Sequence, residues 1–260
     1  MGATGNTIPA EPRLPAGAAS AATGKATARR SGLKTLLQGL FILAASAFLA
    51  WLAWPRLHAS LLYLPVDTAI GNYYRDGRID GRQLEALRAR AREAIAVHPH
   101  HRYWEGLSLL HFVAAADPRK RLYERRDAFE ASIRAGEASL GLAPAQPRAW
   151  LRVARARAWL RYQPEQVIEA LKMAIYTGRV EPALFHARLE LGFAYLPRMD
   201  AEARAMLRDQ LLLAWRMRPR DLVRELRTGS LKFQPVEALL EGAHDPVLDE
   251  IREAVDGPAR

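Results

Sequence analysis

The sequence predicts an all-α protein: a single N-terminal transmembrane helix followed by a tetratricopeptide-like domain, a solenoid of stacked helical hairpins. Three observations lead to this fold class. An uncharged apolar run near the N-terminus is long enough to cross a membrane. The chain beyond it is rich in Ala and Leu, poor in β-branched residues and without strand-like alternation. Prolines divide that part of the chain at regular intervals.

The first 32 residues are predicted to form a disordered cytoplasmic tail. They are rich in Ala, Gly, Thr and Pro and contain almost no large apolar side chains. Such a segment cannot bury enough apolar surface to offset the conformational entropy that ordering removes.

Residues 33–55 are predicted to form the transmembrane helix. From Leu36 to Trp54 the chain carries no charge, and about 19 residues at 1.5 Å each nearly match a hydrocarbon core ~30 Å thick. Trp51 and Trp54 lie where an interfacial aromatic belt is expected. A cleaved signal peptide is the alternative, but the run is long for one and residues 58–60 offer a poor cleavage site.

The basic residues near the span predict its direction. Those that precede it are Lys25, Arg29, Arg30 and Lys34. Only Arg56 and then Arg75 follow it. The positive-inside rule therefore places the tail in the cytoplasm and the large domain on the other side. The Ala-rich, Arg-rich and Lys-poor composition favours a bacterial origin, so we expect the inner membrane and a periplasmic domain.

Residues 66–240 are predicted to form the helical-repeat domain. The expected helices are 67–75, 80–97, 101–115, 119–141, 146–161, 165–177, 183–196, 201–217 and 219–228. Asp80, Asp117 and Asp200 precede three of them and are suitable N-caps. Residues 241–260 are expected to form a C-terminal tail with one weaker helix near 246–255.

Four prolines divide this domain into segments of similar length, at intervals of 45, 38 and 37 residues. They are Pro99, Pro144, Pro182 and Pro219. Helix pairs that repeat every 34–47 residues indicate a helical solenoid, and Ala170, Ala174 and Pro182 give the best tetratricopeptide-like match. We expect about three degenerate hairpins whose stacking leaves a groove for a partner.

Four runs in the domain resemble VpsP-like polysaccharide biosynthesis proteins and related membrane-anchored proteins of proteobacteria. They are RAWLRVARAR at 148–157, ALKMAIYTG at 170–178, EPAL at 181–184 and RLELG at 188–192. The likeness covers roughly residues 65–240. It implies an accessory role in an exopolysaccharide or capsule cluster, and it supplies no catalytic residues to transfer.

Motifs for catalysis are sparse. The chain has no Cys, which excludes disulfides, thiolate metal sites and cysteine nucleophiles. The segment His98-Pro99-His100-His101 is the one cluster that suggests metal ligands, but it lacks the spacing of a zinc site and is better explained as a polar turn. Carboxylates such as Glu169 have a basic residue three or four positions away, which is typical of intrahelical ion pairs. We therefore expect no enzyme, metal or cofactor, with a metal-dependent hydrolase as an alternative.

The net charge of +10 is divided between the N-terminal segment and a domain rich in both signs. Nucleic-acid binding needs basic residues concentrated on one face, so we expect no nucleic-acid partner. Arg148, Arg152 and Arg155 share a helix face by their spacing. With the aromatic residues Tyr103, Trp104 and Trp159 they are the candidate partner-binding residues, and an acidic peptide or anionic glycan is the expected ligand. The alternative is that Trp fills the core and Arg forms a solvated rim.

Together these patterns predict a non-enzymatic scaffold or adaptor, anchored in the bilayer, for proteins of polysaccharide assembly or export. A periplasmic module that binds an anionic glycan directly and a general cell-envelope adaptor are the alternatives.

Overall fold

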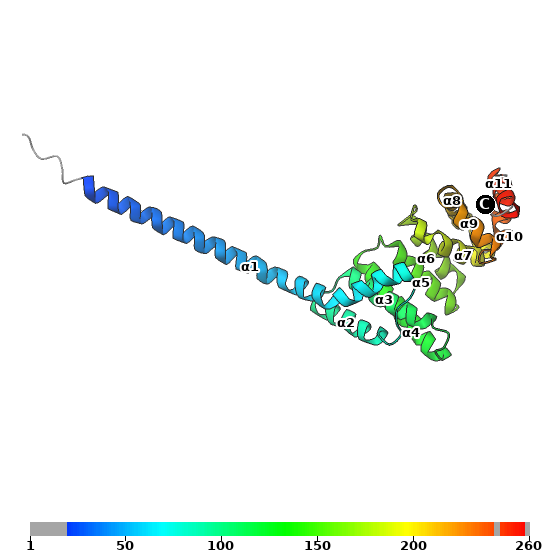
Figure 1. Cartoon of the computed structure of the whole chain (residues 1–260), viewed down its shortest axis with the longest axis horizontal. Coiled ribbons are helices and arrows are strands. Elements are labelled where there is room, and N and C mark those ends of the chain that lie inside the picture. Colours follow the sequence, from blue (N-terminus) through cyan, green and yellow to red (C-terminus); the bar gives the residue numbers. More distant parts are fainter. Residues whose placement is uncertain (1–19, 242–244, 258–260) are drawn as a thin grey trace, which may run out of the picture. The chain divides into compact units, whose positions relative to one another are not determined.

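The computed structural model describes residues 20–241 and 245–257, and within these ranges all regular secondary structure is helical. It comprises eleven α-helices and two short 3-10 helices (Figure 1). The chain divides between Pro55 and Arg56 into two compact units. The first contains most of the long N-terminal helix, and the second contains the rest of that helix and all the others.

Helix α1 spans Ser20–Asp76 and is the one helix of the described chain that is long and apolar enough to cross a membrane. Its large apolar side chains at Leu36 and from Leu40 to Trp54 are exposed. Residues 1–19 of the predicted tail lie outside the described residues. The helix begins within the remaining part of that tail, at Ser20, in a stretch rich in the strong helix former Ala.

The expected segment 67–75 is helical but is not a separate helix, because α1 continues without interruption through Pro55 and Pro65. A proline inside a helix removes one backbone hydrogen bond, which usually ends the helix. Around Pro65 the neighbouring side chains of Tyr63 and Val66 are buried in the core of the second unit. Their packing offsets the lost hydrogen bond and holds the helical path.

The second unit continues with ten α-helices joined by short connections. They are α2 (Leu84–Val97), α3 (His101–Ala116), α4 (Leu122–Leu142), α5 (Pro147–Trp159), α6 (Pro164–Tyr176), α7 (Phe185–Tyr195), α8 (Ala201–Met217), α9 (Pro219–Arg227), α10 (Phe233–Leu240) and α11 (Val247–Asp256). The 3-10 helices η1 (Pro182–Leu184) and η2 (Leu196–Arg198) flank α7. The predicted N-cap of α8 is confirmed, since Asp200 accepts a hydrogen bond of 2.7 Å from the backbone N–H of Ala203.

Helix α10 was not predicted, and Pro235 lies inside it. Phe233 is the first helical residue, so Pro235 is in the first turn. The backbone N–H groups of a first turn have no acceptor within the helix, and a proline there costs no hydrogen bond. Val236, Leu239 and Leu240 are buried and attach the helix to the core.

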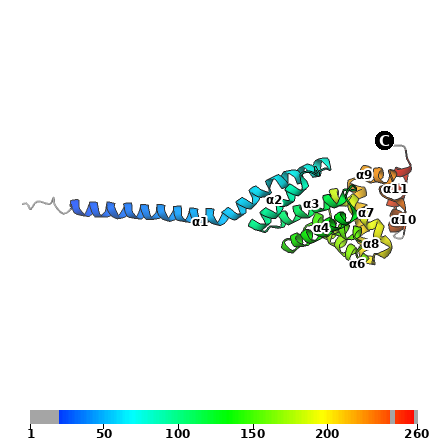
Figure 2. The ribbon, with the colours of Figure 1, turned by 90° about the horizontal axis from the view of Figure 1, so that it is seen from below.

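The helices of the second unit pack mainly against the next or second-next helix in the chain. Helices α2, α3 and α4 lie side by side in both views (Figure 2). Small residues allow α3 and α4 to approach closely: the hydroxyls of Ser108 and Ser132 each donate a 2.9 Å hydrogen bond to the other residue's backbone carbonyl. One buried cluster joins α1, α2 and α3, and a second extends from α3 to α11.

Candidate functional site

Two neighbouring pockets lie along the part of α1 that follows Pro55, and both belong to the second unit. The first, of about 620 Å³, lies between α1 and the α2–α3 connection. The second, of about 440 Å³, lies between α1, α3 and the start of α5. Tyr63, Asp67 and Arg102 line both pockets. These three residues therefore separate two adjoining hollows on one surface.

The wall between the pockets is built on an aromatic contact. The rings of Tyr63 and Tyr103 are 4.6 Å apart, and the Tyr63 hydroxyl donates a 3.1 Å hydrogen bond to the carbonyl of Arg102. A side chain at Gly106 would overlap the Tyr63 hydroxyl, so only glycine leaves room for this ring. Across the wall, Arg102 Nη2 donates to Asp67 Oδ1 over 2.6 Å.

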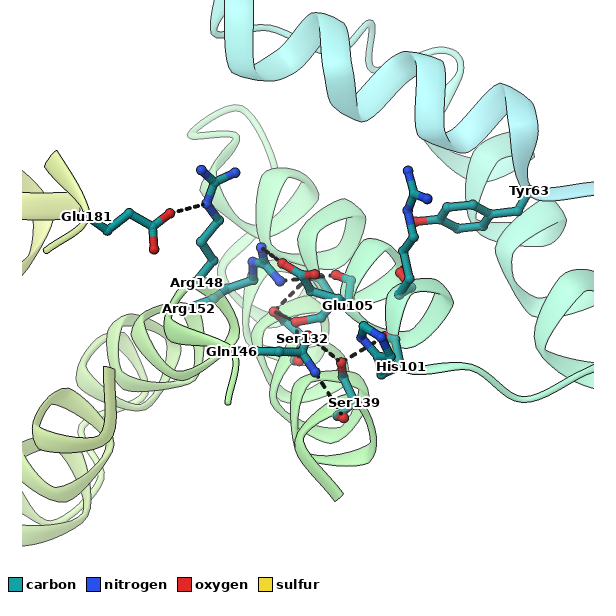
Figure 3. A network of polar contacts seen from close by, with 11 residues as sticks. Tyr63, His101, Glu105, Ser132, Ser139, Gln146, Arg148, Arg152 and Glu181 are labelled. Carbon is teal, nitrogen blue, oxygen red and sulfur yellow. Dashed lines mark hydrogen bonds and ion pairs between the residues drawn. The ribbon is translucent and has the colours of Figure 1, made fainter. Parts of the chain in front are cut away.

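The second pocket contains the arginines of α5. Arg148 Nε donates a 2.9 Å hydrogen bond to Glu181 Oε1, and its guanidinium lies 4.8 Å from the centre of the Tyr74 ring. Arg152 is only 7% exposed and donates from Nη1 to the carbonyl of Glu105, over 3.1 Å. Its Nη2 is 3.6 Å from the Glu105 carboxylate. Figure 3 shows both arginines extending from α5, Arg148 toward Glu181 and Arg152 toward Glu105.

A polar network beneath the pockets fixes the start of α3. The Ser139 hydroxyl donates a 2.8 Å hydrogen bond to the carbonyl of His101 (Figure 3). The Gln146 amide donates to the carbonyls of Ser139 and Ala143, at 3.4 and 2.6 Å. These bonds tie the α4–α5 connection to the first turn of α3, and so hold the pocket walls in place.

The structure brings three of the six predicted partner-binding residues to this surface. Arg148 and Arg152 line the second pocket, and Tyr103 lines the first. Tyr103 is only 7% exposed, so it belongs chiefly to the core.

The other three lie elsewhere in the domain. Arg155 faces Glu190 at 3.6 Å and the ring of Phe112 at 5.6 Å. Trp159 stacks on Phe129 with ring centres 4.4 Å apart, and Trp104 packs against the cluster of α1, α2 and α3.

Sequence reasoning missed the contribution of α1 to the site. Tyr63, Asp67, Ile70 and Tyr74 recur at intervals of three and four and line the second pocket together. That spacing was visible in the sequence, but Tyr63 lay outside the expected helix 67–75. Nothing local indicates the ion pair of Asp67 with Arg102, whose partners are 35 residues apart.

The His98–His101 segment joins α2 to α3 as a turn. Among the residues with described positions, no three His, Asp or Glu side chains are placed to hold a metal ion. Instead His100 is the N-cap of α3, and its Nδ1 accepts a 3.3 Å hydrogen bond from the backbone N–H of Arg102. Partial burial and the neighbouring His101, His98, Arg102 and Arg56 lower the pKa of His100, which favours the neutral ring that this bond requires.

No protein-family model matches the chain, and no curated protein or solved structure matches it either. The resemblance to VpsP-like proteins therefore stays a prediction.

Proposed function

We propose that this protein is a membrane-anchored, non-enzymatic adaptor whose helical domain recruits proteins of exopolysaccharide or capsule assembly or export. The observation that carries this proposal is the packing of the second unit, in which helices contact mainly their near neighbours in the chain. Repeat domains that pack in this way create extended surfaces that bind partners. The apolar stretch of α1 supports the membrane anchor.

A tetratricopeptide-like solenoid is the form of this domain that we favour. The junction prolines fit it: Pro99 and Pro144 lie between helices, Pro182 begins η1 and Pro219 begins α9. Ala170 and Ala174, the small residues expected to allow close helix packing, are fully buried in α6.

The surface of the second pocket is the site where we place the partner. Tyr74 is 49% exposed, and the Arg148 guanidinium lies over its ring. Tyr and Arg are enriched among the residues that dominate binding energy at protein interfaces. Because Arg152 is already buried against Glu105, we expect Arg148 and Tyr74 to make the direct contacts.

Photo-crosslinking in intact cells tests this placement. A photoreactive phenylalanine analogue replaces Tyr74 in one strain and Tyr123 in another. Tyr123 is a matched control, since it is also an exposed tyrosine, 56% accessible, on α4 and away from both pockets. We expect a specific protein adduct from position 74 and none from position 123. Equal yields at both positions, or no adduct at position 74, would contradict the proposed surface.

The identity of the trapped protein tests the pathway separately. Polysaccharide polymerases, chain-length regulators or export proteins would support the assignment. Recovery of division proteins or other envelope proteins would instead favour a general envelope adaptor.

A second candidate function is direct binding of an anionic glycan in the periplasm. Its support is the convergence of Arg102, Arg148 and Arg152 on one pocket, since guanidinium groups pair with carboxylates. Isothermal titration of the full-length protein with polygalacturonate should then give binding that Arg148→Gln weakens. Arg134→Gln removes the same charge from α4 and should leave the affinity unchanged. Equal affinities of both variants would exclude this site.

A further inference from the structure

The first pocket carries an excess of basic groups that the adaptor function does not use. Arg56 and Arg102 line it together with His98 and His100, and Asp67 is the sole acid among its lining residues. The groups come from α1 on one side and from the α2–α3 connection and the first turn of α3 on the other. Basic side chains therefore face one cavity from two directions.

This positive charge is only partly neutralised. Asp67 is engaged with Nη2 of Arg102, which leaves the other guanidinium nitrogens of Arg102 available. No carboxylate of the described chain lies within ion-pair distance of Arg56. Partial burial and, after it, the neighbouring His101, His98, Arg102 and Arg56 lower the pKa of His100.

The second pocket differs in this respect. Each of its three arginines has one carboxylate partner: Glu105, Glu181 or Asp67. The first pocket is thus the one with unmatched positive charge.

The first pocket also offers hydroxyl donors and a helix N-terminus. The hydroxyls of Ser60 and Tyr103 lie 3.1 Å apart on its wall. Helix α3, which has 16 residues, begins at His101 beside the cavity, and its N-terminal partial positive charge adds to that of the side chains. Two guanidinium groups, two imidazoles and hydroxyls suit an anion with several acceptor oxygens.

We propose that the first pocket binds a phosphate ester, held between Arg56 on α1 and Arg102 on α3. The cavity of about 620 Å³ has room for the phosphate and a small attached group such as glycerol or a sugar. Two sources share this chemistry: the headgroup of a phospholipid and a soluble phosphate ester. Arg56 follows the apolar run of α1 by a single residue in the sequence, which makes a headgroup a natural ligand.

The test uses the full-length protein in dodecyl maltoside and has two arms. In the first, isothermal titration measures binding of sn-glycerol 3-phosphate. In the second, native mass spectrometry compares retention of phosphatidylglycerol with that of a diacylglycerol with the same acyl chains. Arg56→Gln and Arg102→Gln are measured with Arg126→Gln, a matched control that removes an exposed arginine from α4.

We expect each pocket variant to weaken phosphate binding at least about tenfold, the effect of losing one charge-assisted contact, and the control to bind as the wild type does. Arg56 forms no ion pair among the residues with described positions, so its variant keeps the test valid if Arg102→Gln disturbs the fold. Binding in the lipid arm alone identifies a headgroup, and binding in the titration alone identifies a soluble ester. No binding in either arm, or equal affinity of Arg56→Gln and Arg126→Gln, overturns the proposal.

Discussion

Arg188 is a fully buried cation, and no carboxylate of the described chain forms an ion pair with it. Its Nη1 donates to Gln210 Oε1 over 2.7 Å, and its Nη2 donates to the carbonyl of Ala174 over 2.5 Å. Burial lowers the pKa of Arg188 to about 10, and Glu181 partly opposes this, so the group stays charged at neutral pH. Ala174 lies near the C-terminal end of α6, where the helix dipole favours a positive charge.

We predict that Gln210→Leu lowers the free energy of unfolding by about 2 kcal/mol, because it leaves a buried guanidinium without its side-chain acceptor. Arg188→Met should also destabilise the protein. The double variant should lose less than the sum of the two, since each single change strands the other partner. Denaturant unfolding of the full-length protein in detergent, in a double-mutant cycle, measures this coupling, and simple additivity would disprove it.

His111 makes the stability of the protein depend on pH. Burial, reinforced by Arg88 and Arg92, lowers the pKa of His111 to about 4, whereas an unfolded histidine titrates near pH 6.5. Between these values the unfolded chain binds a proton that the folded chain does not. The contribution of His111 to the free energy of unfolding is therefore complete above pH 6.5. It is lost as the pH drops toward 4, by about 3 kcal/mol in total.

We expect His111→Gln to flatten this part of the pH profile. Unfolding curves of wild type and variant between pH 7.5 and 4.5 provide the comparison. Titration of carboxylates lowers the free energy of unfolding equally in wild type and variant. This effect cancels when the two pH profiles are subtracted. Parallel profiles would show that His111 does not carry the effect.

At the scale of the elements, the contact of α4 with its neighbours depends on residues of minimal size. A Cβ at Gly136 would lie 2.7 Å from Val153 Cγ2 and 3.3 Å from Ser108 Oγ. The same helix contains Gly141, where an added Cβ meets nothing within 4 Å. The two positions hold the same residue, but only Gly136 lacks room for a larger side chain.

We predict that Gly136→Ala destabilises the protein by about 1–2 kcal/mol, because the overlap outweighs the gain in helix propensity. Gly141→Ala should be neutral or stabilise by up to about 1 kcal/mol. Thermal unfolding followed by circular dichroism compares them. A stabilising Gly136→Ala would mean that α3 and α5 yield to the added methyl group.

The elements also show what local sequence information determines. The cap at Asp200 and the buried Ala170 and Ala174 were predictable, because capping and helical periodicity act within a few residues. The path of α1 through Pro65 was not, since packing of Tyr63 and Val66 against distant helices decides it.

The arginines of α5 show what could not be predicted about the candidate site from the sequence. Arg155 does share a face with Arg148, but seven residues move it about 10 Å along the axis. That displacement takes it to Glu190 of α7 instead of to α1. Residue spacing alone predicts which side chains share a face of a helix. Which neighbouring helix each of these side chains contacts depends on the tertiary arrangement.

For the whole molecule, the predicted direction across the membrane is open to a clean test because the chain has no Cys. We predict that Arg126→Cys reacts in intact cells with a membrane-impermeant maleimide. Thr23→Cys should react only after permeabilisation, since the positive-inside rule predicts a cytoplasmic tail. Labelling of Thr23→Cys but not of Arg126→Cys in intact cells would indicate the opposite topology.

The neighbour-to-neighbour packing of the helices has a kinetic consequence. Most contacts join residues that are near each other in the chain. Forming such a contact closes only a short loop and costs little entropy, so the domain should fold quickly for its size. Folding can begin at any well-packed pair, such as α3 with α4, and spread outward from there. A domain emerging on the far side of a membrane would then gain structure helix by helix, without waiting for its C-terminus.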